Sequence, residues 1–92
     1  MNEEVKIDMN ANDVIRKAQE EFIRLGKKRA NGVTGLSKTE EGWKVLLEAL
    51  ERKAIPDSMD VLGLYELRLD NEGNLLGFDR KKLRKRAETQ ED

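Results

Sequence analysis

The sequence predicts an α+β fold, in which one N-terminal helix packs on a small antiparallel β-meander of three to four strands. Three observations lead to this prediction: a helical stripe of apolar residues near the N-terminus, a later segment that alternates apolar and charged residues, and turn residues between short strands. Each hairpin needs only a short turn, and one apolar helix stripe can cover one face of a sheet. A chain of 92 residues fits a single domain.

The first predicted element is a helix that starts at Asp13. Apolar residues follow helical spacing from there, and polar or charged residues occupy the other side. Asn10 or Asn12 can cap its start, and Gly26 or the later Asn31-Gly32 can end it. The apolar stripe consists of Val14, Ile15, Ala18, Phe22 and Leu25.

The segment that follows Gly32 predicts a first hairpin. VTGLSKTEEGWKV indicates a short strand, a polar turn at residues 40–42 and a second strand that opens at Trp43. The segment 43–53 is ambiguous between strand and helix. Its apolar residues alternate as in a strand, but a second subset makes a helical stripe, and its leucine, alanine and glutamate content favours helix.

The second predicted hairpin has the clearest strand signal. Apolar and charged residues alternate over 65–70, the segment 70–73 supplies turn chemistry that ends in glycine, and LLGF at 75–78 resumes a strand. Pro56 cannot donate a hydrogen bond to a sheet, so we expect it to close the preceding element. The final block, 79–92, starts basic and ends acidic, which leaves it open between a helix and a frayed tail.

The expected organisation has three parts. Residues 1–12 form a flexible N-terminal arm, in which Val5 and Ile7 could dock as an edge segment. Residues 13–86 form the single α+β domain, and residues 87–92 form an acidic C-terminal tail. We expect a modest core, because aromatic residues make up only 4% of the chain.

The composition excludes several functional classes. The formal net charge is -1 although 40% of residues are charged, which is unlike the strongly basic footprint of a general polyanion binder. The start of the chain has no signal-peptide pattern, and no apolar run reaches the roughly 20 residues that cross a bilayer. We therefore expect a cytoplasmic protein without membrane contact.

No catalytic motif is visible. The chain has neither histidine nor cysteine, which excludes Ser-His and Cys-His dyads and the commonest metal ligands. There is no phosphate-binding glycine loop, and most carboxylates stand beside lysine or arginine. Asp70, Glu72 and Asn74 are weakly similar to a calcium loop, but turn chemistry explains them better. We expect no enzyme activity, no cofactor and no metal.

One dense basic block follows the second hairpin. Its cations could contact an acidic protein partner or hold phosphates, since neutralised phosphates release counterions. Stacking aromatic residues do not accompany it, because all four aromatic residues of the chain fit core positions. We interpret the block first as solvated surface or a helix end, next as a surface for a partner protein, and last as a nucleic-acid site. The block consists of Arg80, Lys81, Lys82, Arg84, Lys85 and Arg86.

A longer pattern carries a family resemblance. The pair Gly42-Trp43, then Glu48, then IPDSMDVLGLYELRLDNEGNLLGFDR at 55–80 match in order and spacing a PD-x-x-DVL-x-x-YE-x-x-LD-x-x-G core. Between about Gly32 and Arg86 the chain resembles the gas-vesicle protein O family. The matching residues that we expect to be mainly structural are Trp43, Pro56, Asp57, Asp60, Tyr65, Glu66, Asp70 and Gly73. Among them, Asp57, Asp60 and Glu66 are candidates for a fixed hydrogen bond or a partner contact.

The resemblance implies a non-enzymatic accessory protein in the formation of gas vesicles, the protein shells that give cells buoyancy. It implies a protein–protein interaction module that contacts other accessory proteins or the shell protein, with the basic block and a sheet edge as the contact surface. The alternative is a small nucleic-acid-binding regulator that uses the 80–86 block. The chain departs from the family pattern at Ala54, Phe78, Leu83 and Arg84, which leaves the identity of the partner open.

Overall fold

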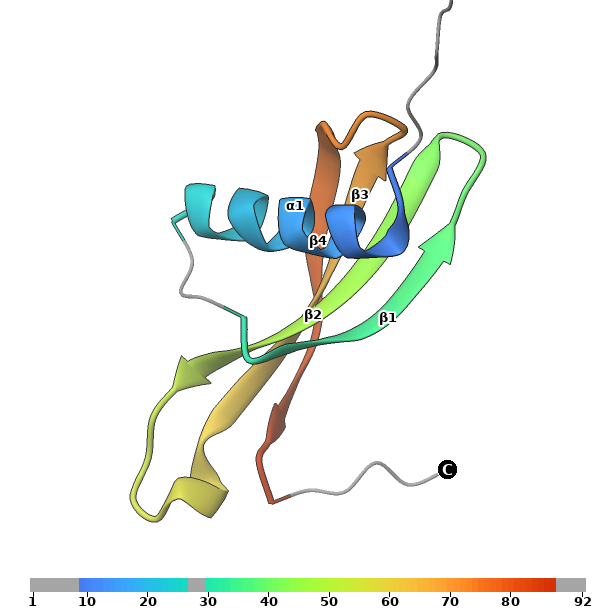
Figure 1. Ribbon diagram of the computed structural model, residues 1–92. Coiled ribbons are helices and arrows are strands. Elements are labelled where there is room, and N and C mark those ends of the chain that lie inside the picture. Colours follow the sequence, from blue (N-terminus) through green and yellow to red (C-terminus); the bar gives the residue numbers. More distant parts are fainter. Residues whose placement is uncertain (1–8, 27–29, 88–92) are drawn as a thin grey trace, which may run out of the picture.

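The computed structural model describes residues 9–26 and 30–87 as one helix against one sheet (Figure 1). The four strands form an antiparallel sheet in the order β1-β2-β3-β4, and the helix α1 lies across one face of it. The predicted α+β fold is therefore confirmed. The elements are α1 (Ala11–Arg24), β1 (Gly32–Lys38), β2 (Gly42–Arg52), the short 3-10 helix η1 (Asp57–Met59), β3 (Val61–Asp70) and β4 (Leu75–Lys85).

The helix α1 begins at Ala11, two residues earlier than predicted, because Asn10 is its N-cap. The Asn10 side chain accepts from the Asp13 N–H at 2.9 Å, and the Asp13 carboxylate accepts from the Asn10 N–H at 3.4 Å. This reciprocal arrangement satisfies two backbone donors that the helix leaves unpaired. Gly26 follows the helix with φ of 86°, which a residue with a side chain rarely adopts. The expectations for residues 1–8 fall outside the described residues.

The ambiguous segment 43–53 is a strand almost throughout. β2 pairs with β1 on one side and β3 on the other, so its backbone groups are satisfied by two neighbours. Val45, Leu47 and Ala49 point to the helix-covered face and are buried. Helix propensity is worth only a few tenths of a kcal/mol per residue, about 0 to 0.7, and two ladders of hydrogen bonds outweigh it.

The turn of the second hairpin is held by Asp70. Its carboxylate accepts from the backbone N–H groups of Glu72 and Asn74, each at 2.9 Å, and from the Asn74 side chain at 3.1 Å. These bonds, the one from the Asn74 backbone first, lower the pKa of Asp70. Gly73 closes the turn with φ of 90°. The hairpin is confirmed, and Asp70 and Asn74 bond to each other and to the turn backbone.

The basic block is neither a helix nor a frayed tail, so that expectation is wrong. β4 continues to Lys85, which lies opposite Val61 at the start of β3. Pairing with the full length of β3 decides the conformation, although the alternation of apolar residues stops at Phe78. Residues 88–92 fall outside the described part of the chain.

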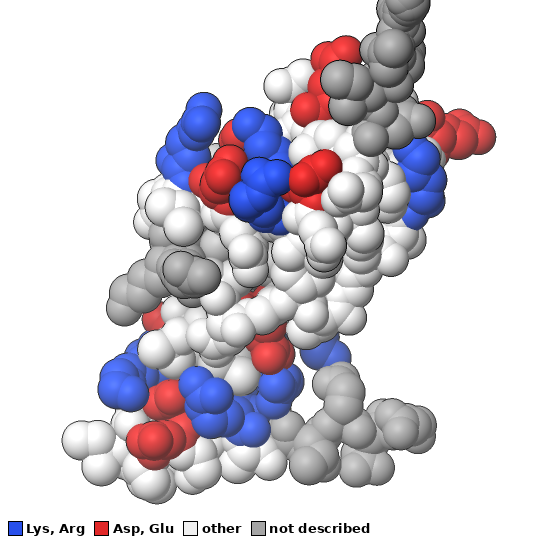
Figure 2. Space-filling view, in the orientation of Figure 1, with Lys and Arg blue, Asp and Glu red and all other residues white. Residues whose placement is uncertain are grey.

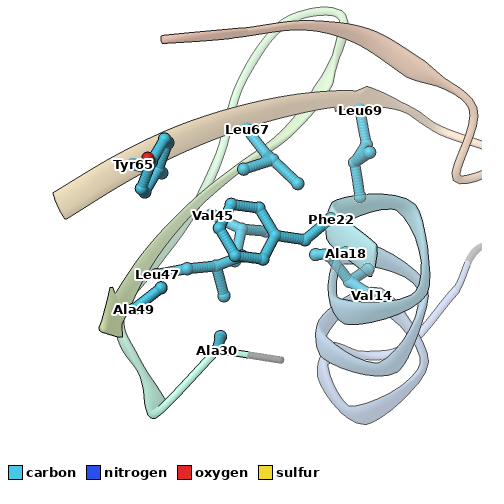
Figure 3. Packing of buried hydrophobic residues seen from close by; sticks show 10 residues of the cluster. All are labelled: Val14, Ala18, Phe22, Ala30, Val45, Leu47, Ala49, Tyr65, Leu67 and Leu69. Carbon is cyan, nitrogen blue, oxygen red and sulfur yellow. The ribbon is translucent and has the colours of Figure 1, made fainter. Parts of the chain in front are cut away.

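The core lies between α1 and the sheet (Figure 3). Phe22 and Tyr65 are both buried, and their rings meet edge to face with centroids 5.0 Å apart. Trp43 and Phe78 are partly buried at the margin of the cluster, so all four aromatic residues contribute to the core as expected. The buried cluster consists of Val14, Ala18, Phe22, Ala30, Val45, Leu47, Ala49, Tyr65, Leu67 and Leu69.

Candidate functional site

The basic block lies on an edge strand. In the described sheet, β4 has a neighbouring strand on one side only, so backbone N–H and C=O groups along its outer edge do not pair within the sheet. Lysine and arginine are common on such edges because their charge discourages unplanned strand pairing. An edge with this composition remains available to a partner strand of suitable charge.

The strongest ion pair of the block joins Arg84 to Glu48 of β2. Arg84 Nε donates to Glu48 Oε2 at 2.9 Å and Arg84 Nη2 donates to Oε1 at 3.1 Å, which makes the pair bidentate. The two side chains are 26% and 19% exposed. Since β3 lies between β2 and β4 in the sheet, this contact ties three strands together.

Arg80 belongs to a second cluster, with Glu51 of β2 and Tyr65 of β3. The Tyr65 hydroxyl donates a hydrogen bond to Glu51, and Arg80 Nη1 lies 3.6 Å from Glu51 Oε1. Burial raises the pKa of Tyr65, and its bond to the Glu51 carboxylate raises it further. The hydroxyl therefore stays protonated and acts as a donor near neutral pH.

Lys81 joins a looser network on the sheet surface. Its Nζ lies 4.0 Å from Glu66 Oε1 and 3.8 Å from Asp79 Oδ2. Arg68 contacts the same two carboxylates at 3.1 and 3.2 Å. Glu66 is thus engaged within the sheet, and the network contributes modestly to stability because its other members are well exposed.

Arg86 closes over the buried carboxylate of Asp60, which is only 2% exposed. The carboxylate accepts from the Ala54 N–H at 2.7 Å and from Arg86 Nε at 3.2 Å. The backbone N–H of Ala54 contributes most to the lowered pKa of Asp60. Two backbone bonds complete the contact, from Arg86 N–H to Asp60 C=O at 2.8 Å and from Ala87 N–H to Ser58 C=O at 2.9 Å. We call these contacts the Asp60 latch.

The Asp60 latch fixes the connection between β2 and β3. Within it, the Met59 N–H donates to the Pro56 C=O at 2.9 Å and the Asp60 N–H donates to the Asp57 C=O at 2.8 Å. The Ile55-Pro56 peptide bond is cis. Asp57 takes part in the connection through its backbone C=O, which accepts the hydrogen bond from the Asp60 N–H. The connection leaves the Ile55 side chain 98% exposed and Met59 41% exposed.

Two cations at the start of this connection lack an ion pair. Among the described residues, Arg52 and Lys53 make none, although the charge of Lys53 helps to lower the pKa of Asp60. Lys82 makes none either, but it lies opposite Leu64, farther along the sheet. Figure 2 shows Lys and Arg side chains interspersed with Asp and Glu at the lower end of the molecule, where Figure 1 places the β2–β3 connection. Most of the predicted block thus contacts carboxylates of the same chain.

Two features were missed from the sequence. Glu48 and Arg84 are 36 residues apart, and nothing in the sequence places them on neighbouring parts of one sheet face. The exposure of Ile55 was also missed, but a signal existed: it is an isolated apolar residue between a basic segment and Pro56 in a turn. Such a residue has no periodic partner with which to share a buried face.

The described residues contain no group of three or more acidic side chains placed to hold a metal ion. In the same part of the chain, the one helix is too short and too polar to cross a membrane.

Comparison with known proteins gives one consistent result. The family model described as "Gas vesicle synthesis protein GvpO" matches residues 1–90. The chain is 29% identical over 83 residues to gas vesicle protein O1 of Halobacterium salinarum, covering 90% of this chain and 67% of that protein. It is 37% identical over 67 residues to gas vesicle protein O of a Streptomyces species, covering 73% and 52%.

A third relative, gas vesicle protein O of Haloferax mediterranei, is 35% identical over 52 residues, covering 56% of this chain and 37% of the relative. The chain therefore spans between about a third and two thirds of the length of these relatives. No solved structure matches. The resemblance seen between Gly32 and Arg86 is confirmed, and it extends over almost the whole sequence. Because the family match covers residues 1–90, the chain belongs to the gas vesicle synthesis protein GvpO family.

Proposed function

We propose that the protein acts in the cytoplasm as a non-enzymatic accessory factor in gas vesicle formation. It works as a protein–protein interaction module for other gas vesicle proteins, either accessory proteins or the shell protein. Family membership supports the role in gas vesicle formation. The observation that carries the binding role is the position of β4 at the sheet edge, with 11 residues and a neighbour on one side only.

The edge of β4 binds a partner by strand addition. Unpaired backbone groups supply main-chain hydrogen bonds, and alternate side chains supply specificity. The bidentate pair between Arg84 and Glu48 and the Asp60 latch anchor the C-terminal end of β4, so that end loses little conformational freedom on binding. Lys82 has no ion pair among the described residues, which favours a partner segment with carboxylates.

The nucleic-acid alternative is weaker in this geometry. Affinity for a phosphate backbone grows with the number of phosphates that cations neutralise. Within the described residues, Arg80, Lys81, Arg84 and Arg86 each contact a carboxylate of the same chain. Few cations of the block then remain for phosphates. A filter-binding titration at low salt should detect no binding, and binding that falls steeply with salt would favour the alternative.

The proposed function is tested by deleting the gene in a vesicle-forming strain and counting vesicles by electron microscopy. We expect vesicle formation to be lost or strongly reduced, and to return when the wild-type chain is supplied. A strain that forms vesicles in normal number and shape without the gene would contradict the proposal.

A further inference from the structure

We propose that the β2–β3 connection is an apolar docking tip that inserts Ile55 and Met59 into an apolar groove with an acidic rim on a partner protein. We call residues 53–60 the tip. The inference rests on the proposed function, since it assumes that the protein works by binding, and it adds a second surface at a place that strand addition to β4 does not use.

The exposure of the tip is the first argument. Ile55 is 98% exposed, more than any other large apolar side chain among the described residues, and Met59 is 41% exposed. Both side chains lie outside the core cluster. Both belong to the same short loop, and exposed apolar surface concentrated in one place is typical of interaction sites. Burying one isoleucine side chain strengthens an interface by about tenfold to a hundredfold.

The rigidity of the tip is the second argument. The Asp60 carboxylate binds the Ala54 N–H at the start of the tip and Arg86 after β4. The turn bonds at Pro56 and Asp57 and the bond from Ala87 to Ser58 fix the segment between them. A preformed loop that displays apolar side chains avoids much of the entropy cost that a flexible loop pays on binding. The Asp60 latch thus holds Ile55 in place for a partner.

The charge around the tip indicates the kind of partner. Arg52 directly precedes the tip and Lys53 begins it, and neither makes an ion pair within the described part of the chain. Figure 2 shows Lys and Arg together with Asp and Glu around this end of the molecule, with uncharged surface at its extremity. An apolar anchor beside two unpaired cations fits a groove whose centre is apolar and whose rim carries carboxylates.

Two other occupants fit less well. A second copy of the chain would bring the same cations, Arg52 and Lys53, against each other, and like charges at an interface are repulsive. An anionic membrane would attract the cations, but Asp57, which is exposed, stands between Ile55 and Met59 in the sequence of the tip. Insertion into lipid would bring that carboxylate toward the apolar layer, which is costly.

The test uses the full chain with a photo-crosslinking amino acid at position 55 or, as a control, at position 23. Ile23 is 49% exposed and lies in α1, away from both the tip and the β4 edge. After irradiation of vesicle-forming cells, we expect a crosslink to one gas vesicle protein from position 55 and none from position 23. Mass spectrometry should place it on an apolar segment flanked by Asp or Glu.

The crosslinked protein is then purified, and its Kd is measured for the wild-type chain, Ile55→Ser and the control Ile23→Ser. We expect Ile55→Ser to weaken binding at least about tenfold and Ile23→Ser less than about twofold. Higher salt should weaken wild-type binding. Because Ile55 contacts no core residue, Ile55→Ser should unfold at the wild-type temperature, and circular dichroism checks that both variants are folded.

Four results would overturn the inference: crosslinking from position 55 no greater than from position 23, crosslinks between two copies of the chain, an unchanged Kd for Ile55→Ser, or co-sedimentation of the chain with phospholipid vesicles containing anionic lipid. The proposed function fails separately, when deletion of the gene leaves vesicles normal. If deletion abolishes vesicles and Ile55→Ser restores them as well as the wild type does, only the tip inference fails.

Discussion

Phe22→Ala tests how the helix is held on the sheet. Phe22 is fully buried and meets Tyr65 edge to face at 5.0 Å. Replacing a buried Phe by Ala costs about 3–5 kcal/mol, including the cavity left behind. A chain of 92 residues has a free energy of unfolding of about 5–14 kcal/mol at about 0.05–0.15 kcal/mol per residue. The variant should therefore lose at least about a fifth of its stability, and most of it if the wild-type value lies at the lower end of this range.

The assay is urea unfolding followed by the fluorescence of Trp43, the only tryptophan, which packs at the edge of the core. With a slope of about 1–1.5 kcal/mol per molar urea, the midpoint should fall by about 3 M. Ile23→Ala is the matched control, because Ile23 is next in sequence but 49% exposed. It should lose less than about 1 kcal/mol. A loss below about 1 kcal/mol for Phe22→Ala would refute the packing of α1 described above.

Three further predictions concern the sheet and its latch. Gly42→Ala should lower the free energy of unfolding by about 1–3 kcal/mol in urea, because the new methyl group would meet the backbone of β3. Gly32→Ala is the control, because the space there is open. Equal stabilities of the two variants would contradict the close approach of Gly42 to β3. The pKa of Asp60 is lowered from 3.8 in the folded protein. The stability that its carboxylate contributes is therefore present above the unfolded pKa and is lost as the pH falls through the folded pKa. NMR titration should give the Asp60 carboxyl a pKa below 3.8, and a pKa above 3.8 would contradict the latch. Arg84→Glu should destabilise the fold by about 2 kcal/mol, because it removes the bidentate pair with Glu48. Lys82→Glu should change thermal stability little. Equal effects of the two charge reversals would refute the contact between Arg84 and Glu48.

The sequence was sufficient where local chemistry alone decides the structure. The helix around Phe22 has a full apolar stripe and a capping asparagine, and both act within a few residues. The turn at Asp70 likewise contains its own hydrogen-bond acceptor and its own glycine. For such elements the prediction needs no knowledge of distant partners.

The sequence was insufficient where residues far apart along the chain determine the conformation of a segment or the contacts of a side chain. Segment 43–53 satisfies two periodicities, and only pairing on both sides makes it a strand. β4 carries a run of cations without clear alternation beyond Phe78, and its conformation follows from β3. The role of the cations depends on their carboxylate partners, which come from β2 and from the β2–β3 connection: Glu48, Glu51 and Asp60.

The same dependence changes how the candidate site is interpreted. As a sequence, the block Arg80–Arg86 suggested one basic surface for a partner. In the folded chain, Arg84 and Arg86 hold carboxylates of the sheet and of the β2–β3 connection, so their side chains are structural. Reversal of the whole block would therefore unfold the sheet as well as remove charge, and single changes at Lys82 or Ile55 separate the two effects.

The central claim is that the protein binds another gas vesicle protein. The most direct test is to purify the tagged full chain under native conditions from vesicle-forming cells whose vesicles depend on it, and to identify and quantify the proteins retained. The account predicts that at least one other gas vesicle protein is retained at a ratio near that of a stoichiometric complex. Retention of no gas vesicle protein above the level found with the tag alone would contradict it.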